Sequence, residues 1–181
     1  MKKTITYFIA FLSLSIFSQT KYITKNGTVN FEASVSSFEE VKAINNSVTA
    51  IIDTKNGEFA ALVLVKGFRF KNALMEEHFN ENYAESDMYP KAIFKGKFEE
   101  FSLEKLSSKS IFKINGMLTF HGETKKLESI PFKFSNDKDL IQVSGSFKVN
   151  TSDFNIKIPK VVKDKVSETV EIFLNFTLKK T

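Results

Sequence analysis

Apolar and polar residues alternate along much of the chain, and the last apolar stretch shows this most clearly. Five apolar residues recur there at every second position, namely Val170, Ile172, Leu174, Phe176 and Leu178. The residues between them are polar, with Phe173 as the exception. A two-residue period with one apolar side is the pattern of a β-strand that has one buried and one solvated face. We therefore predict a strand over residues 170–178.

The same alternation recurs through the chain, and phenylalanine, which occurs 20 times, carries much of it. The stretches that show it are residues 29–35, 47–54, 58–66, 92–98, 112–120, 130–134, 141–149 and 154–158. Asn26-Gly27 and Asn56-Gly57 are dipeptides typical of two-residue hairpin turns. A long series of strands has to stack or to close, and closure gives a barrel with an apolar interior. We predict an all-β fold, a single up-and-down antiparallel barrel of about eight strands.

One stretch departs from the two-residue period. Met75, Phe79 and Tyr83 recur every four residues, which is the spacing of one helix face, and an asparagine suited to an N-cap precedes them. We predict one α-helix over residues 72–83. A short helical turn near residues 160–166 would fit between the proline that precedes it and the last strand.

The first 18 residues have the form of a secretory signal peptide. Two lysines precede an apolar run of about 13 residues, which is too short to span a bilayer because a membrane helix needs about 20. Ser18 supplies a small residue at a plausible cleavage point. We expect an exported protein, periplasmic or secreted. Residues 19–181 would form one domain without a transmembrane segment.

Composition and charge narrow the function further. The formal net charge of +5 becomes +3 without the two lysines of the N-terminal segment, which is too small to argue for a nucleic-acid partner. The chain has no cysteine, so packing rather than disulfides must hold the fold. It shows neither a glycine-rich phosphate loop nor a recognisable arrangement of a nucleophile and a base. We therefore predict no cofactor and no catalytic residues.

The apolar residues on the inner side of the predicted strands are the candidates for the wall of an internal cavity. They are Phe94, Phe98, Phe112, Ile114, Leu118, Phe120, Phe132, Phe134, Val143, Phe147, Ile156, Ile172, Leu174 and Phe176. Rigid aromatic rings can hold a hydrocarbon chain without specific polar groups. The alternative is that these side chains fill the barrel completely, since eight-stranded barrels do both.

The two histidines of the chain, His78 and His121, are open to two interpretations. They could form a metal site or a proton-transfer pair. However, one histidine in a helix and one in a turn, without close spacing, is a poor metal signature, and we predict no metal site. The other interpretation is structural: His121 caps a turn with Gly122, and His78 packs the helix against one end of the barrel.

Three segments resemble the YceI-like family of exported lipid-binding proteins. Residues 75–79 read Met-x-x-His-Phe and lead into Tyr-Pro-x-x-x-Phe at residues 89–94. Residues 115–125 contain a second match, Gly-x-Leu-Thr-x-His-Gly-x-Thr-Lys, and residues 153–159 a weaker third. The three occur in the order of the family, so the resemblance covers roughly residues 66–178. The usual Asp-x-x-His-Ser opening of the family is missing from the earlier part of the chain.

The resemblance implies a lipocalin-like barrel whose apolar cavity holds a long isoprenoid or fatty chain. The function would then be non-enzymatic binding of an amphipathic lipid outside the cytoplasm, with a cavity mouth near His78, Tyr83, Tyr89 and His121. Two other functions stay open. One is a filled barrel that acts as a stress-related or interaction module, and the other is a lipocalin-like hydrolase or isomerase that uses both histidines. A homodimer also stays open.

Overall fold

The structure is a computed structural model, and it describes residues 21–35 and 40–181. The predicted signal peptide lies outside the described residues. The strands are β1 (Lys21–Ser34), β2 (Lys42–Asp53), β3 (Glu58–Leu64), β4 (Arg69–Phe70), β5 (Lys91–Phe98), β6 (Ile111–Phe120), β7 (Glu123–Asp137), β8 (Leu140–Asn150) and β9 (Val166–Lys180). The helical elements are α1 (Ala73–His78), the π-helical turn η2 (Phe79–Tyr83) and the 3₁₀ turns η1 (Val65–Gly67), η3 (Glu104–Ser107), η4 (Thr151–Phe154) and η5 (Lys160–Val162).

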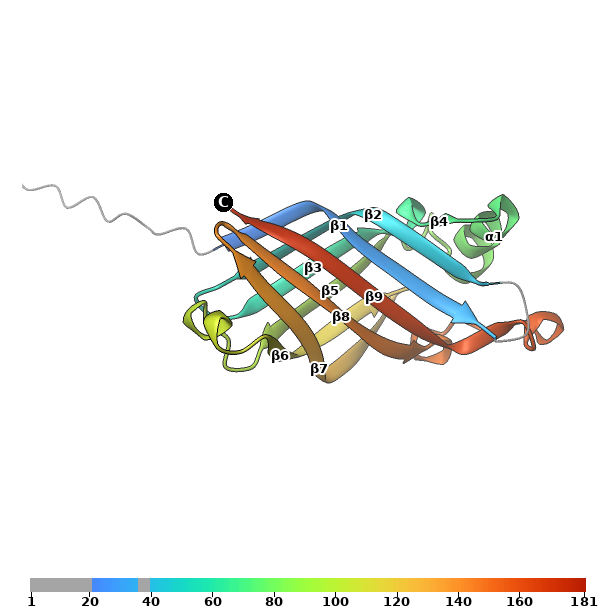
Figure 1. Cartoon of the computed structure of the whole chain (residues 1–181). Helices are drawn as coiled ribbons and strands as arrows, with labels where there is room; N and C mark the ends of the chain where they lie inside the picture. The colour runs from blue at the N-terminus through green and yellow to red at the C-terminus, as the bar shows by residue number, and fades with distance from the viewer. Residues whose placement is uncertain (1–20, 36–39) are drawn as a thin grey trace, which may run out of the picture.

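Eight of the strands form a closed antiparallel barrel (Figure 1). Each long strand pairs with the next one in the chain, and β9 returns to pair with β1, where Phe31 stands opposite Ile172. The two-residue β4 lies outside this sequence of pairings and adds only to the end of β2. The seam between β7 and β8 is paired only from Phe132 and Gly145 to Asp137 and Leu140, so residues 123–131 of β7 and 146–150 of β8 do not pair with each other. The predicted all-β, up-and-down barrel is confirmed.

The helix is confirmed as well, in two parts. Asn72 caps α1, because its side chain accepts a hydrogen bond of 2.9 Å from the backbone N–H of Leu74. The chain continues directly from α1 into η2, and together they cover the predicted range. The predicted helical turn near 160–166 is η5. Within the described residues, none of the helices has the length and hydrophobicity that a membrane span requires.

The two Asn-Gly dipeptides differ in outcome. Asn56-Gly57 does lie in the turn between β2 and β3, but the turn spans residues 54–57 rather than two residues, with Asp53 opposite Glu58. Gly57 has a φ of +74°. The prediction of a turn at Asn26-Gly27 is wrong, because β1 runs through both residues with only two shifts of register, one on each side of Gly27. A Cβ atom on Gly27 would lie 2.4 Å from a ring carbon of Phe176. Because Gly27 has no side chain, the ring of Phe176 can pack against the backbone of β1.

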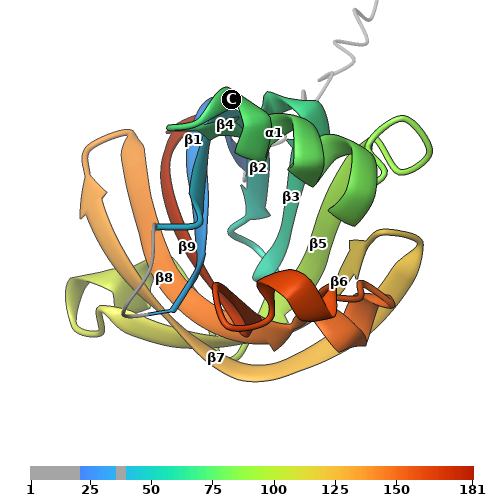
Figure 2. The same cartoon turned by 90° about the vertical axis from the view of Figure 1, so that its right-hand side faces the viewer.

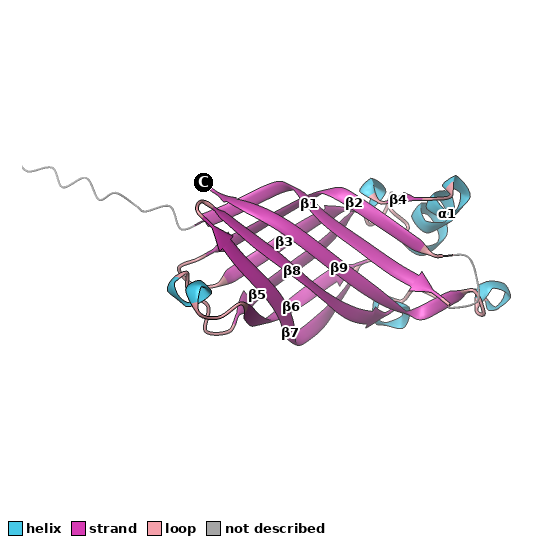
Figure 3. Cartoon of the chain, in the orientation of Figure 1, coloured by secondary structure: helices cyan, strands magenta, loops and turns pink. Residues whose placement is uncertain are grey.

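The helical turns lie at the two ends of the barrel, as Figure 3 shows by colour. The loop that contains η3 covers one end, which we call the closed end. At the opposite end lie α1, η2 and η5, and we call this the open end. The first described residue, Lys21, is at the closed end, where its carbonyl accepts a hydrogen bond of 3.0 Å from the backbone N–H of Thr181.

A set of phenylalanine rings fills the closed end. We call it the aromatic plug, and it consists of Phe98, Phe101, Phe112, Phe132 and Phe134. The ring centroids of Phe98 and Phe134 are 4.8 Å apart, and those of Phe101 and Phe112 are 5.1 Å apart. Phe112 is fully buried, and Phe98 and Phe132 are 2% and 1% exposed. Aromatic pairs at such distances add to the free energy gained from burial alone. This half of the barrel is a solid core.

Candidate functional site

The half of the barrel toward the open end is hollow. It encloses a cavity of about 470 Å³, which lies within the usual range for small-molecule sites. Inward-facing apolar side chains of seven barrel strands form most of its wall. Figure 2 looks into the barrel from the open end, with α1 on one side of the entrance and the segment from η4 to η5 on the other. The interior is therefore divided along its axis into a packed half and an empty half.

The predicted wall residues divide between these two halves. Eight of them line the cavity, namely Phe94, Leu118, Phe120, Phe132, Phe147, Ile156, Ile172 and Leu174. The other six are packed in the core without lining it, namely Phe98, Phe112, Ile114, Phe134, Val143 and Phe176. Thirteen of the fourteen lie on strands, where the alternation places them inward. Ile156 lies in the loop after η4, so the prediction of a strand over residues 154–158 is wrong. The level along the barrel axis separates the two sets.

Further wall residues come from the N-terminal strands, which lie outside the segments that carry the family motifs. Val29, Phe31 and Ala33 of β1 line the cavity, as do Phe59, Ala61 and Val63 of β3. The two-residue alternation of these segments was the signal that could have placed them in the wall. The N-terminal third of the chain therefore contributes as directly to the cavity as the segments that carry the family motifs.

A cluster of four rings fixes the helix to the rim of the barrel. Phe79 of η2 lies 5.3 Å from Phe31, 5.8 Å from Phe68 and 5.2 Å from Phe70, measured between ring centroids. All four residues line the cavity. Met75 precedes Phe79 by one helical turn and also lines it. The apolar helix face predicted from the sequence thus forms part of the cavity entrance.

Two of the four predicted mouth residues, His78 and Tyr83, line the cavity. Tyr89 and His121 are not part of its lining; their rings pack against each other with centroids 4.7 Å apart. The sequence prediction missed four polar residues of the lining, Asn150, Thr151, Lys165 and Ser167. They come from the end of β8, from η4, from the residue just before β9 and from the start of β9, so only the fold brings them together with the helix.

His121 joins two segments of the open end. Its Nδ1 lies 2.8 Å from the carbonyl oxygen of Phe154, and its Nε2 lies 2.7 Å from a carboxylate oxygen of Glu85. The two partners belong to different segments, Phe154 to η4 and Glu85 to the loop after η2. The side chain of His121 is 12% exposed. With both nitrogens engaged in these bonds, His121 has the geometry of a structural residue rather than of a base that faces the cavity.

Asp153 holds the segment around η4 against the barrel. It forms an ion pair with Lys125 of β7, and it accepts a hydrogen bond of 2.8 Å from the backbone N–H of Asn150. The hydrogen bond from Lys125 contributes most to lowering the pKa of Asp153 below its ordinary value of 3.8, and the bond from Asn150 adds to it. Phe154 and Ile156, which follow in the chain, line the cavity. The ion pair thereby helps to position one side of the entrance.

We expect Asp153→Ala to lower the free energy of unfolding by about 1 kcal/mol at neutral pH, because it removes one half of the capping box of η4 together with an ion pair. A lowered pKa in the folded state stabilises the protein above the pKa of the unfolded state. The difference between wild type and variant should therefore be complete above about pH 4 and shrink as the pH falls through the folded-state pKa. Urea unfolding at a series of pH values measures it. Asp164→Ala is the control, because Asp164 is exposed and pairs with no basic residue within residues 21–35 and 40–181.

The family follows from the whole-chain comparison. The model of the YceI-like domain matches residues 19–178. The chain belongs to the YceI-like family. The match includes the N-terminal strands, in which the family's opening motif is missing. No curated protein matches the sequence.

Solved structures of the family share the fold at low sequence identity. A polyisoprenoid binding domain from Saccharophagus degradans, implicated in plant cell wall breakdown, has 11% identity and a TM-score of 0.75, over 91% of this chain and all of that one. Burkholderia cenocepacia BcnA has 14% identity and a TM-score of 0.70, over 84% and 96% of the two chains. The YceI protein of Campylobacter jejuni has 16% identity and a TM-score of 0.65, over 81% and 89%. At these identities the likeness is one of fold.

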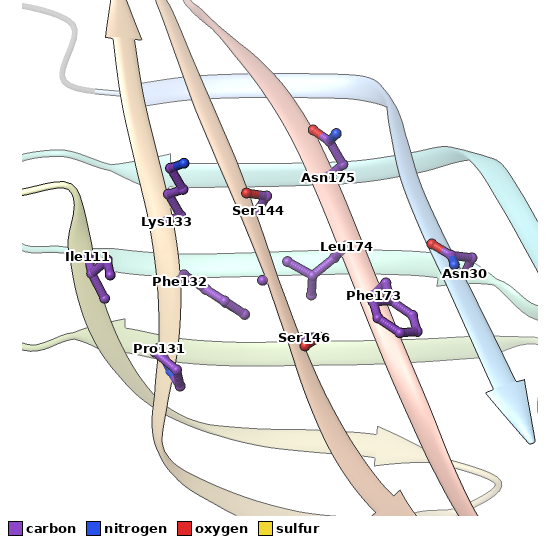
Figure 4. A pocket seen from close by; sticks show the side chains of 11 residues that line it. Asn30, Ile111, Pro131, Phe132, Lys133, Ser144, Ser146, Phe173, Leu174 and Asn175 are labelled. Atoms are coloured by element: carbon purple, nitrogen blue, oxygen red, sulfur yellow. The ribbon is translucent and has the colours of Figure 1, made fainter.

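A second hollow lies on the outer wall of the YceI-like barrel (Figure 4). It is a groove of about 620 Å³, open to solvent, in which Ser144 and Ser146 lie between Lys133 on one side and Phe173 and Asn175 on the other. Phe173, the exception in the alternation of the last strand, is thus on the outside. The lining of this groove is mixed, whereas that of the internal cavity is almost entirely apolar. Across residues 21–35 and 40–181, we find no cluster of histidine and acidic residues that could hold a metal ion.

Proposed function

We propose that this protein binds an amphipathic lipid, isoprenoid-like in character, outside the cytoplasm and without changing it chemically. The observation that carries the proposal is the apolar cavity inside the barrel, whose polar lining residues come from elements at the open end. The family model and the polyisoprenoid binding domain among the structural neighbours support it. The form of the N-terminal segment supports export.

The cavity wall favours a hydrocarbon chain on energetic grounds. Each CH₂ group that leaves water for an apolar site gains about 0.8 kcal/mol. Ten such groups would give about 8 kcal/mol, against which stands the cost of losing translational and rotational freedom. No strong polar contact is required along the chain. A chain that is branched or unsaturated, as isoprenoids are, fits a wall of flat aromatic rings.

The entrance would hold the polar head group. His78 and Tyr83 lie on the helix side of the cavity lining, and Lys165 and Ser167 lie on the side of β9. These side chains can donate hydrogen bonds to a head group, and Lys165 adds a positive charge. The binding mode is therefore polar end outward and hydrocarbon end toward the aromatic plug.

Native mass spectrometry of gently purified protein tests the proposal. We expect a mass above that of the mature chain, and extraction should release a lipid whose mass matches the difference. Recovery of apo protein alone, together with no uptake of a fluorescent long-chain fatty acid, would contradict lipid binding. Incubation with the extracted lipid should return it unchanged, whereas a product of altered mass would contradict non-enzymatic binding. The same spectra give the oligomeric state.

A further inference from the structure

We propose that Phe132, seated against Gly145, limits the length of hydrocarbon chain that the cavity accepts. This inference rests on the proposed lipid binding and adds a specificity-determining residue to it. Phe132 belongs both to the cavity lining and to the aromatic plug, so it lies at the boundary between the hollow and the packed halves.

Beyond Phe132, packed aromatic rings occupy the interior of the barrel. Its ring centroid lies 5.8 Å from that of Phe98, and the ring of Phe98 packs in turn against that of Phe134. Phe59 completes the floor of the cavity, with its ring centroid 5.7 Å from Phe98 and 5.9 Å from Phe176. A chain that enters from the open end therefore stops at Phe59 and Phe132, which have rigid packed rings behind them.

Gly145 determines where the ring of Phe132 lies. The two residues are directly opposite each other on β7 and β8, and Leu174 of β9 is the next partner in the row. Figure 4 shows the side chain of Phe132 directed across β8 toward Leu174. A Cβ atom on Gly145 would lie 1.8 Å from a ring carbon of Phe132. The ring can occupy this position only because Gly145 has no side chain.

A fixed floor predicts a break in the dependence of affinity on chain length. Each added CH₂ group should raise the affinity about fourfold while the chain still extends into the cavity. Once the chain reaches Phe132, further carbons stay outside the apolar wall and the affinity should level off. The chain length at this break measures the depth of the cavity.

Two variants should move the break in opposite directions. Phe132→Leu removes part of the floor, and we expect the break to come at longer chains. Gly145→Ala displaces the ring of Phe132, and because Phe98 blocks movement toward the plug, the ring must move into the cavity. For that variant we expect the affinity to level off at shorter chain lengths. Phe120→Leu is the matched control, since Phe120 lines the cavity near the open end, where its ring packs against that of Phe154.

The experiment measures dissociation constants of saturated fatty acids from about 10 to about 20 carbon atoms, for the wild type and the three variants. Phe120→Leu should weaken binding at every length without moving the break. An unchanged break in folded Phe132→Leu would overturn the assignment of Phe132, even if Gly145→Ala fails to fold. If the wild type binds no fatty acid of any length, the proposed lipid binding itself fails, which is a separate outcome.

Discussion

Replacing Ala61 by phenylalanine is expected to weaken lipid binding about 100-fold while leaving the barrel folded. Ala61 lines the cavity from β3, and its pairing partners across the neighbouring strands are Ala50 and Phe94. A new ring at this position enters the hollow half and takes the place of about three to four CH₂ groups of a bound chain. At about 0.8 kcal/mol for each group, the loss corresponds to roughly two orders of magnitude in affinity.

The control for Ala61→Phe is the same substitution one residue earlier. Ala60 stands between Ile51 and Lys95 on the outward face of the barrel, so Ala60→Phe adds the same ring outside the cavity. Uptake of a fluorescent fatty acid, measured by titration, compares the two variants. Both should keep the circular dichroism spectrum of the wild type. Wild-type affinity in folded Ala61→Phe would show that the ligand does not occupy this cavity.

The second large effect is expected at the aromatic plug. Phe98→Ala should lower the free energy of unfolding by about 3–5 kcal/mol, the usual cost of deleting a buried ring. Phe98 packs against Phe59, Phe101, Phe132 and Phe134, so its removal leaves a gap that none of these rings can fill without losing other contacts. For a domain whose total stability is about 5–15 kcal/mol, this is a large fraction.

Urea unfolding followed by far-ultraviolet circular dichroism measures this loss, which suits a chain that has no tryptophan. Phe120→Ala serves for comparison, because Phe120 is only half-buried and borders the empty half of the barrel. The ring of Phe120 has fewer packing partners, so we expect Phe120→Ala to lower the free energy of unfolding by less than Phe98→Ala does, with a difference of at least about 1 kcal/mol. Equal costs for the two variants would contradict the division of the barrel into a packed and a hollow half.

The histidines show how chemistry suggested by sequence depends on geometry. From the sequence alone, His78 and His121 could be a catalytic or metal-binding pair or two structural residues. The structure gives His121 two acceptors, Phe154 and Glu85, and leaves His78 at the cavity entrance. Glu85 is 36 positions from His121 and Phe154 is 33. No local pattern could have indicated these partners, because they meet only when the barrel has closed.

The sequence by itself determined the barrel and its apolar interior. Strand, helix and face are local properties: a period of two assigns each residue to the inside or the outside, and a period of four marks the helix face. For this reason the antiparallel barrel, the helix over 72–83 and the inward face of β5 to β9 could be predicted from the residues alone. The strand predicted over residues 154–158 was wrong, because this segment forms η4 and a loop. The predicted turn at Asn26-Gly27 was wrong, because the missing side chain of Gly27 makes room for the distant ring of Phe176 and does not shape a local turn.

Only the tertiary structure decided where along the barrel axis each inward residue lies. Phe132 and Phe134 are two positions apart on one face of β7, yet the first borders the cavity and the second is entirely within the plug. Leu174 and Phe176 divide in the same way on β9. Strands in a barrel are tilted and staggered, so the level of a residue depends on its register with every neighbouring strand. That register is a property of the closed sheet, and it determines which aromatic rings support the fold and which are left to meet a ligand.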